Sequence, residues 1–289
     1  MIKKAIILAG GLGTRMSPLT KAVNKQLLPV YDKPLIYYPL SILMLAGIRN
    51  ILVVVNKGQL YQFKNILGNG ERFGIKIIYK EQKTPKGLPD AFLLGEKFIE
   101  KDNVALILGD NFFYGQSLTL KLRDCVKLKS GCKILVHPVK SPELYGVAII
   151  NRKRKIVSLK EKPKNSKSNL AVTGLYFFDN KVIKYSKTLK PSKRNELEIV
   201  DLLNKYRKKN KLSAEFLGRG GAWLDTGSID DFYNTSSFVS SIENRQGLKI
   251  ACLEEIAFKN NWIDKNEIKK SINFYGKCSY SLYLKKLIN

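Results

Sequence analysis

The feature that most constrains the fold is a series of short apolar segments that alternate with helical patterns. Continuous runs rich in valine, isoleucine and leucine are typical of strands buried on both faces of a sheet. They occupy residues 6–9, 51–55, 75–79 and 104–108, and helical patterns lie between them at residues 34–46, 59–67 and 91–98. This alternation predicts an α/β fold, Rossmann-like, with a mixed, mostly parallel sheet flanked by helices.

The remainder of the chain changes character twice. Short strand patterns separated by turn residues make the middle β-rich, at residues 134–139, 147–150, 156–159 and 173–178. Helical patterns follow at residues 229–242 and 252–260. We therefore expect one mixed domain over residues 1–227 and a C-terminal helical extension over residues 228–289.

The charge of the chain is strongly positive. Lysine and arginine number 51 against 24 acidic residues, which gives a net charge of +27. A nucleic-acid-binding protein is one interpretation, because basic surfaces bind phosphate backbones. The lysines recur along the whole chain, however, and the densest cluster, residues 151–155, falls where a hairpin turn is expected. We expect a basic, solvated surface with no nucleic acid as partner, whose field attracts phosphate substrates.

Cysteine and hydropathy patterns favour a cytoplasmic protein that does not associate with membranes. The four cysteines form no CxxC pair and no metal-ligand spacing, so free thiols are expected. The longest apolar run, residues 35–48, carries Pro39 and Ser41 and is too short for a membrane span. The only histidine, His137, has no partner triad, which argues against zinc or histidine-dependent hydrolase chemistry.

A glycine-rich turn follows the first predicted strand. Gly10, Gly11, Gly13, Thr14 and Arg15 belong to it, and Lys25 lies shortly after it. Glycines leave backbone N–H groups free to approach phosphate oxygens. A dinucleotide fingerprint beginning at the second glycine would need glycine or alanine at position 16, which is methionine, and the Walker pattern is absent. Arginine offers a planar fork for phosphate and lysine a compact charge, as transfer between two anions requires.

Two aspartates are candidate ligands for a divalent cation. Asp110 follows the fourth predicted strand, at the sheet edge that also carries the glycine-rich turn, and Asp225 lies in Trp-Leu-Asp-Thr-Gly far along the chain. Mg²⁺ commonly takes one or two carboxylates together with substrate phosphates. From the residues alone, Asp110 is the stronger candidate, whereas Asp225 could equally be a turn-forming aspartate.

These motifs together resemble the sugar nucleotidyltransferases, and among them the glucose-1-phosphate thymidylyltransferases. The resemblance rests on residues 10–15 with Pro18, Thr20 and 25–29, and it continues at 31–40, 173–176, 222–227 and 245–257. It covers nearly the whole chain. It implies that the chain transfers a thymidylyl group from dTTP to α-D-glucose 1-phosphate, giving dTDP-glucose and pyrophosphate, with Mg²⁺ as cofactor. This is the first step toward dTDP-L-rhamnose and related deoxysugars of polysaccharides.

The resemblance also implies roles for individual residues. Arg15, Lys25, Lys162, Asp110 and Asp225 would be catalytic, and the two aspartates would hold the metal. Gln26, Gln82, Gly87 and Leu88 would join the glycine-rich turn in binding the nucleotide. The sugar phosphate would contact Asn111, Gly146, Glu161, Lys162, Val172 and Arg194. A homotetramer inhibited by the downstream sugar nucleotide is implied as well, with a regulatory pocket at Tyr114, Gly115, Gly218, Arg219, Lys249, Glu255 and Ile256.

Three alternatives remain at this level. Residues 83–86 and 88–90 depart from the commonest residues of the family, and one methyl group separates thymine from uracil, so a UTP-using or dual-specificity relative fits the sequence. A basic nucleic-acid-binding protein would leave the glycine-rich turn and both aspartates unexplained. An inactive regulatory homologue conflicts with the presence of Arg15, Lys25 and both aspartates.

Overall fold

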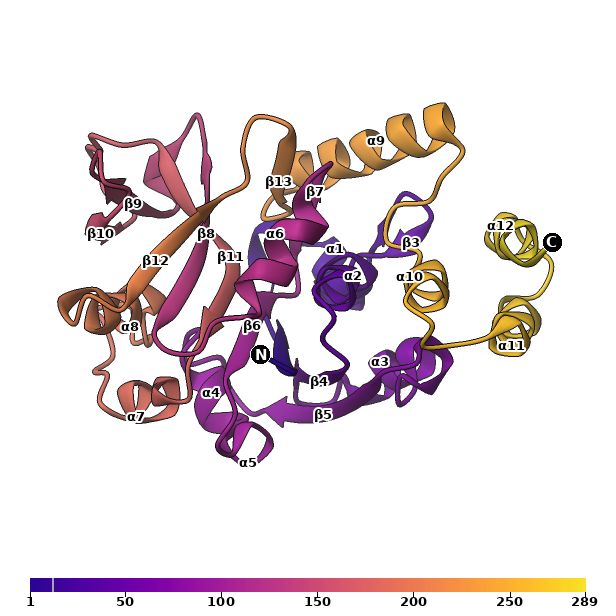
Figure 1. The fold of residues 1–289 in the computed structure, drawn as a ribbon, viewed down its shortest axis with the longest axis horizontal. Helices are drawn as coiled ribbons and strands as arrows, with labels where there is room; N and C mark the ends of the chain where they lie inside the picture. The colour runs from indigo at the N-terminus through magenta and orange to yellow at the C-terminus, as the bar shows by residue number, and fades with distance from the viewer. Residues whose placement is uncertain (12) are drawn as a thin grey trace.

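A nine-stranded sheet forms the centre of the computed structural model, which describes residues 1–11 and 13–289 (Figure 1). Leu12, in the glycine-rich turn, lies outside the described residues. The strands follow the order β10–β9–β11–β6–β1–β4–β5, and β8 pairs with β11 and with β12. Their bounds are β1 Lys4–Ala9, β4 Asn50–Asn56, β5 Lys76–Gln82, β6 Val104–Leu108, β8 Cys132–Pro138, β9 Gly146–Ile150, β10 Ile156–Glu161, β11 Leu170–Phe178 and β12 Leu212–Phe216.

The half of the sheet built by β6, β1, β4 and β5 is parallel throughout, as the apolar runs predict. Alternate side chains of each strand enter opposite cores, because successive residues of a strand face opposite sides. Ile7 and Val53 pack in the core on the α2 side, whereas Ile6 and Leu52 pack against α4. Strands buried on both faces therefore need no polar alternation, which explains the sequence pattern.

Helices cover both faces of this sheet. Their bounds are α1 Leu19–Ala22, α2 Tyr37–Leu45, α3 Leu60–Leu67, α4 Asp90–Leu94, α5 Glu96–Ile99, α6 Leu118–Cys125, α7 Lys181–Lys187 and α8 Ile199–Lys208. The single helix predicted at residues 91–98 is wrong, because Gly95 divides it into α4 and α5. A Cβ on Gly95 would stand 2.9 Å from Ile6 Cδ1, so the backbone approaches the sheet closely there. The helix predicted from residue 34 begins at Tyr37, since Lys33 and Pro34 form β3 and pair with β2 (Pro29–Val30).

The β-rich part is antiparallel where β9, β10 and β11 meet, and β9 and β10 form the predicted hairpin. A second, two-stranded sheet lies outside the main one: β7 (Asn111–Gly115) pairs antiparallel with β13 (Gly221–Asp225). Neither strand of this pair was expected from the sequence. The pairing brings Asp225 opposite Asn111, next to the end of β6.

The C-terminal helices pack on the main core. They are α9 Ile229–Gln246, α10 Leu253–Lys259, α11 Lys265–Tyr275 and α12 Ser279–Ile288, and in Figure 1 α10–α12 lie at the right while α9 runs along the top. Leu253 and Leu284 belong to the same buried cluster as Leu40 of α2. The boundary predicted at residue 228 coincides with the start of α9, whose first turn is capped by Ser228, but the hydrophobic core continues across it.

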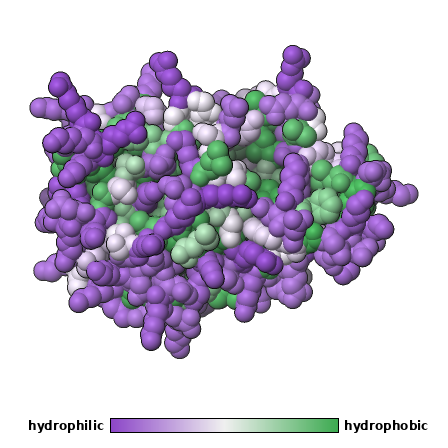
Figure 2. Space-filling view, in the orientation of Figure 1, coloured by the Kyte–Doolittle hydropathy of each residue, from purple (hydrophilic) through white to green (hydrophobic). Residues whose placement is uncertain are grey.

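The surface is hydrophilic over most of the face shown in Figure 2, with a hydrophobic hollow below α9. Within residues 1–11 and 13–289, none of the helices combines the length and hydrophobicity that a membrane span requires.

Candidate functional site

The glycine-rich turn lies at the carboxyl end of β1, and close contacts at Gly10 and Gly13 leave little room for a side chain. A Cβ on Gly10 would stand 1.9 Å from Gln82 Nε2, and Gln82 donates a hydrogen bond of 2.7 Å to the Gly10 carbonyl. Gly13 has φ +61° and lies against Thr20, whose hydroxyl donates to the Gly13 carbonyl over 2.8 Å. Among the described residues, no atom distant in the chain lies within 4 Å of a virtual Cβ on Gly11. Gly10 and Gly13 are thus each held by a contact with a distant part of the chain.

Lys25 and Asp110 form an ion pair beside this turn. Gly109 donates its backbone N–H to the Leu8 carbonyl over 2.9 Å, which places the end of β6 against the end of β1. Lys25 Nζ lies 2.7 Å from Asp110 Oδ2, and the lysine is only 5% exposed. Burial favours the neutral acid, but the charge and hydrogen bond of Lys25 outweigh it and hold the pKa of Asp110 below its ordinary value. The sheet edge predicted from the strand pattern is confirmed.

Asp225 joins Asp110 through the β7–β13 pairing. Thr226, which follows Asp225, donates both its backbone N–H (3.2 Å) and its hydroxyl (2.8 Å) to the Asp110 carbonyl. Burial and then the negative charge of Asp110 raise the pKa of Asp225 to about 6. The two carboxylates, far apart in sequence, thus share one electrostatic environment.

Arg15 reaches the same place from the glycine-rich turn. A Cβ on Gly227 would lie 2.8 Å from Arg15 Nη2 and 3.2 Å from Asp225 Oδ2. Thr14 and Arg15 form the start of a short 3₁₀ helix, Thr14–Met16, and both are exposed while Met16 is buried. The absence of a side chain at Gly227 is what lets the guanidinium approach Asp225.

The carboxylate pair fits a magnesium ion. Among the described residues there is no cluster of three or more histidine, cysteine or acidic side chains, so a closed, all-protein metal cage is not built. Mg²⁺ instead prefers one or two carboxylates and completes its shell with water and phosphate oxygens. Besides burial, the negative charge of Asp110 raises the pKa of Asp225, and a divalent cation relieves repulsion of this kind.

Three of the six residues expected around the sugar phosphate come together on β9, β10 and β11. Glu161 is opposite Gly146 in the antiparallel register, and a Cβ on Gly146 would lie 3.4 Å from Glu161 Oε2 and 4.0 Å from Val172 Cβ. Burial raises the pKa of Glu161, with a further contribution from Glu198. Gly146, Glu161 and Val172, called the sugar set below, thus lie together on three adjacent strands and carry one carboxylate.

Lys162 and Arg194 flank the sugar set. β10 ends at Glu161, and Lys162 has φ +42°, so the chain turns there and the two side chains need not point to opposite faces. Arg194 donates to both oxygens of Glu198 (2.8 and 3.0 Å) and lies 3.4 Å from Glu161. Carboxylates therefore hold the guanidinium beside the sugar set.

Tyr145 connects the sugar set with the carboxylate pair. Its carbonyl accepts the backbone N–H of Lys162 over 3.0 Å, and its ring packs edge-on against Trp223 with centroids 5.1 Å apart. Trp223 lies on β13, two residues before Asp225. Tyr145 and Trp223 therefore join the group Gly146, Glu161 and Val172 to the strand that carries Asp225.

The residues expected around the base lie in two places, with Gln82 against Gly10 and Gly87 against Leu197. Gln82 and Gln26 are buried, and Gln26 Oε1 has no hydrogen-bond partner among the described residues. Gly87 has φ +97°, and a Cβ there would stand 2.2 Å from the Leu197 carbonyl oxygen. The Leu197 N–H donates to the Lys86 carbonyl over 2.8 Å. The segment with Gly87 and Leu88 is thus joined to the segment that carries Arg194.

Five of the seven residues expected in a regulatory pocket line one cavity of about 650 Å³ between α2, β7, α6 and α10. They are Tyr114, Gly115, Lys249, Glu255 and Ile256. Gly218 and Arg219 do not line it; they lie in the turn before β13, whose Gly221 pairs with Gly115. The cavity is separate from the carboxylate pair.

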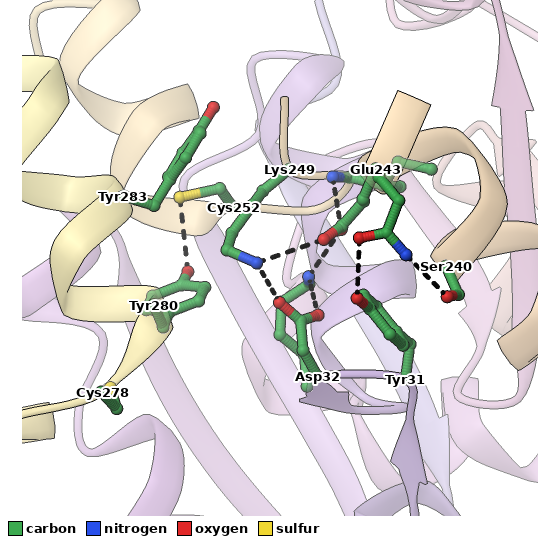
Figure 3. A network of polar contacts seen from close by, with 12 residues as sticks. Tyr31, Asp32, Ser240, Glu243, Lys249, Cys252, Cys278, Tyr280 and Tyr283 are labelled. Atoms are coloured by element: carbon green, nitrogen blue, oxygen red, sulfur yellow. Dashed lines mark hydrogen bonds and ion pairs between the residues drawn. The ribbon is translucent and has the colours of Figure 1, made fainter. Parts of the chain in front are cut away.

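Lys249 also belongs to a buried ion cluster with Asp32, Lys33 and Glu243 (Figure 3). Lys33 Nζ lies 2.9 Å and Lys249 Nζ 3.2 Å from Glu243, and both lysines contact Asp32. Burial alone would lower the pKa of Lys249, but hydrogen bonds and charge from Asp32 and Glu243 raise it. The cluster ties β3 to the end of α9.

Three side chains in the site were not assigned a role from the sequence: Tyr145, Trp223 and Thr226. Trp223 and Thr226 stand in the same motif as Asp225, so the motif was recognised while the roles of its flanking residues were not. Their contacts depend on the β7–β13 pairing, which the sequence pattern does not reveal.

Comparison with known proteins identifies the family of the chain. A family model described as nucleotidyl transferase matches residues 4–242. A glucose-1-phosphate thymidylyltransferase of Neisseria meningitidis serogroup A is 50% identical over 285 residues, which is 99% of both chains. One of Xanthomonas campestris pv. campestris is 47% identical and covers 99% of this chain and 97% of its own.

A solved structure extends the comparison to the fold. UDP-glucose pyrophosphorylase complexed with UDP-glucose superposes with a TM-score of 0.73 and 27% identity, over 84% of this chain and all of that one. With the family model over most of the chain and relatives that match it almost end to end, the chain belongs to the nucleotidyl transferase family.

Proposed function

We propose that this enzyme transfers a thymidylyl group from dTTP to α-D-glucose 1-phosphate, releasing pyrophosphate and dTDP-glucose. The observation that carries the proposal is that Arg15, Lys25, Asp110 and Asp225 meet beside the glycine-rich turn. Tyr145 and Trp223 connect them to Gly146, Glu161 and Val172. The names and near-complete coverage of the relatives support the choice of substrates.

The reaction is an in-line displacement in which positioning and charge neutralisation do most of the work. A phosphate oxygen of glucose 1-phosphate attacks the α-phosphorus of dTTP, and the bond to the pyrophosphate oxygen breaks. Lys162 and Arg194 hold the attacking phosphate, for which Arg194 exchanges part of its contact with Glu198. Arg15 and Lys25 stabilise the charge on the phosphates of the nucleotide. No covalent enzyme intermediate is needed, so the configuration at phosphorus inverts.

Mg²⁺ is the cofactor in this proposal, and Asp110 and Asp225 are its protein ligands. When bound, it would offset the charge that develops on the leaving pyrophosphate. Without bound substrates, Lys25 Nζ lies 2.7 Å from Asp110 Oδ2, and its positive charge keeps this carboxylate ionised.

The remaining assignments concern binding. Gly10, Gly11, Gly13 and Thr14 present backbone to the triphosphate. Glu161, the Gly146 backbone and Val172 contact the glucose hydroxyls and ring. Gln26, Gln82 and the backbone of Gly87 and Leu88 surround the base; an amide can donate to and accept from a pyrimidine edge. Asn111, assigned to the sugar phosphate by resemblance, is 2% exposed and contacts Asp110 directly.

The experiment that tests the proposal is a pyrophosphate-release assay with Mg²⁺, dTTP and glucose 1-phosphate, with the product identified by mass. Replacing Asp110 with asparagine keeps the shape of the side chain and should lower turnover by about 10²–10³-fold, the loss typical of a removed electrostatic group. Near-normal turnover of a folded Asp110→Asn enzyme would contradict the metal role.

UTP is the second candidate nucleotide, because a solved relative in fold contains UDP-glucose. Thymine and uracil differ by one methyl group, and a pocket discriminates a group of that size by about 10–200-fold. Competing dTTP against UTP in the same assay should give a preference for dTTP within this range. A preference for UTP would replace dTTP in the proposal.

We also propose a homotetramer in the cytoplasm, inhibited by the downstream nucleotide sugar dTDP-L-rhamnose in the 650 Å³ cavity. The four cysteines are free, which suits a reducing compartment. The cavity offers Lys249, Arg123 and Lys259 for a diphosphate and Leu45, Phe113 and Ile256 for apolar parts of a ligand. Light scattering tests the assembly, and the assay above with saturating inhibitor tests the regulation.

A further inference from the structure

The side-chain amide of Asn111 makes three hydrogen bonds next to the carboxylate pair. Its Nδ2 donates to Asp110 Oδ1 over 3.0 Å. Its Oδ1 accepts from the backbone N–H of Gly174 over 3.0 Å and from the indole N–H of Trp223 over 2.6 Å. The three contacts join β7, β11 and β13, and the side chain is only 2% exposed.

The neighbours of Asn111 determine which way its amide faces. A backbone N–H and an indole N–H can only donate, so the amide atom facing Gly174 and Trp223 must be the oxygen. The NH₂ group is therefore turned toward the Asp110 carboxylate, which can accept from it. If either donor were removed, this orientation would be less strongly imposed.

The local packing supports the same arrangement. A Cβ on Gly174 would lie 2.6 Å from Asn111 Oδ1, so only glycine lets the β11 backbone come close enough to donate. The Trp223 ring is fixed from its other side by Tyr145, with centroids 5.1 Å apart. The direction of the indole N–H is thus set by packing and not by its hydrogen bond alone.

We propose that Trp223 is a positioning residue that acts through Asn111 to hold Asp110 in the orientation that binds a divalent cation together with Asp225. The inference rests on the proposed function, in which these two aspartates are the metal ligands. Groups that orient metal ligands from behind typically change metal affinity by about 10–100-fold when they are removed. A purely structural tryptophan would affect stability and leave metal affinity unchanged.

The test compares the same substitution at both tryptophans of the chain. Trp223→Phe removes the N–H donor and keeps an aromatic ring against Tyr145. Trp262→Phe is the matched control, because Trp262 contacts Arg49 and Gly74, and neither of them belongs to the proposed metal site. Mn²⁺, whose free form is measured by electron paramagnetic resonance, is titrated into each protein alone and in the presence of dTTP. Thermal unfolding is recorded for each variant.

The expected result is Mn²⁺ binding about 10-fold weaker or more in Trp223→Phe and unchanged in Trp262→Phe. Turnover of Trp223→Phe should recover at high Mg²⁺, with the KM for glucose 1-phosphate unchanged at that concentration. Because Trp223 acts through Asn111, adding Trp223→Phe to Asn111→Ala should weaken Mn²⁺ binding no further.

Two outcomes would overturn the inference in different ways. If the wild-type enzyme forms dTDP-glucose but Trp223→Phe binds Mn²⁺ as the wild type does, the positioning role is wrong and the proposed function stands. If the wild-type protein neither binds Mn²⁺ nor releases pyrophosphate from dTTP with glucose 1-phosphate, the proposed function fails and the inference fails with it.

Discussion

Replacing Gly87 with alanine should move the segment that carries Gly87 and Leu88 away from the segment that carries Arg194 and Leu197, without unfolding the protein. The new Cβ would stand 2.2 Å from the Leu197 carbonyl oxygen and 2.7 Å from its nitrogen, and both atoms are backbone. The glycine also has φ +97°, a conformation that alanine rarely adopts. Neither atom of Leu197 can rotate away, so one segment has to move.

The size of the effect follows from the cheapest way to relieve the contact. Keeping both segments in place would cost about 1–3 kcal/mol for overpacking, in addition to the strain at positive φ. Moving them apart costs mainly the Leu197 N–H hydrogen bond to the Lys86 carbonyl, about 0.5–1.5 kcal/mol net. Separation is therefore favoured, and a loss of about 1 kcal/mol lowers the melting temperature by only about 2–4 °C in a chain of this size.

Catalysis should suffer much more than stability. Leu197 is in the segment that carries Arg194, and Gly87 precedes Leu88. In the proposed function Leu88 contacts the base and Arg194 the sugar phosphate, so separating the segments would change the distance between the two substrates. A misplacement of about 1 Å can reduce the rate of such a reaction by about 10²-fold. We expect kcat/KM to fall by about that factor for dTTP and for glucose 1-phosphate together.

The assay is steady-state pyrophosphate release with each substrate varied in turn, alongside thermal unfolding. Gly47→Ala is the matched control, because Gly47 has φ +83° and no atom within 4 Å of a virtual Cβ. It should show a similar small loss of stability and unchanged kinetics. The reasoning is refuted if Gly87→Ala changes the kinetics for dTTP alone, or if it melts far earlier than Gly47→Ala while keeping wild-type turnover.

Three further predictions concern other parts of the molecule. Burial raises the pKa of Glu254, although the Tyr275 and Tyr280 hydroxyls that bond it lower it in part. The native state therefore binds the proton of Glu254 more tightly than the unfolded state does. The resulting stability is fully present below the ordinary glutamate pKa, about 4.5, and is lost as the pH rises toward the pKa of the folded state. Urea unfolding from pH 4.5 to 8 should show this loss in the wild type and not in Glu254→Gln. Lys249→Ala should abolish inhibition by dTDP-L-rhamnose while uninhibited turnover stays near wild type, and inhibition curves that remain unchanged would remove Lys249 from the regulatory site. Gly227→Ala should displace the Arg15 guanidinium, whose Nη2 lies 2.8 Å from the new Cβ, and lower kcat by about 10-fold or more with little change in melting temperature; equal kcat would show that Arg15 does not act from this position.

The parallel half of the sheet could be predicted because its strands are apolar throughout. No hydrophilic residue interrupts residues 51–55, and only burial on both faces explains such a run. The placement of the glycine-rich turn and Asp110 at one edge followed from parallel strand direction alone. The break at Gly95 was missed because its cause is a contact with Ile6, which is distant in sequence.

The β7–β13 pair shows where sequence patterns stop being informative. Both strands mix glycine, aromatic and polar residues, so neither shows the continuous apolar run or the alternation that predicts a strand. Asp225 could be placed beside Asp110 by family resemblance, but not by periodicity. The hydrogen bonds of Asn111, Trp223 and Thr226 depend on a pairing between distant segments, so no local pattern predicts them.

The same pairing has a consequence for the order in which the protein matures during synthesis. The parallel strands β1, β4, β5 and β6 are complete once the ribosome has passed Leu108, so this half of the sheet can form early. Asp225 reaches Asp110 only when β13, at residues 221–225, adds to β7. A nascent or truncated chain that ends before this strand has the glycine-rich turn and Lys25 but lacks the second acid. Such a chain should hold triphosphate without turning it over, so the onset of activity marks the late arrival of a single short strand.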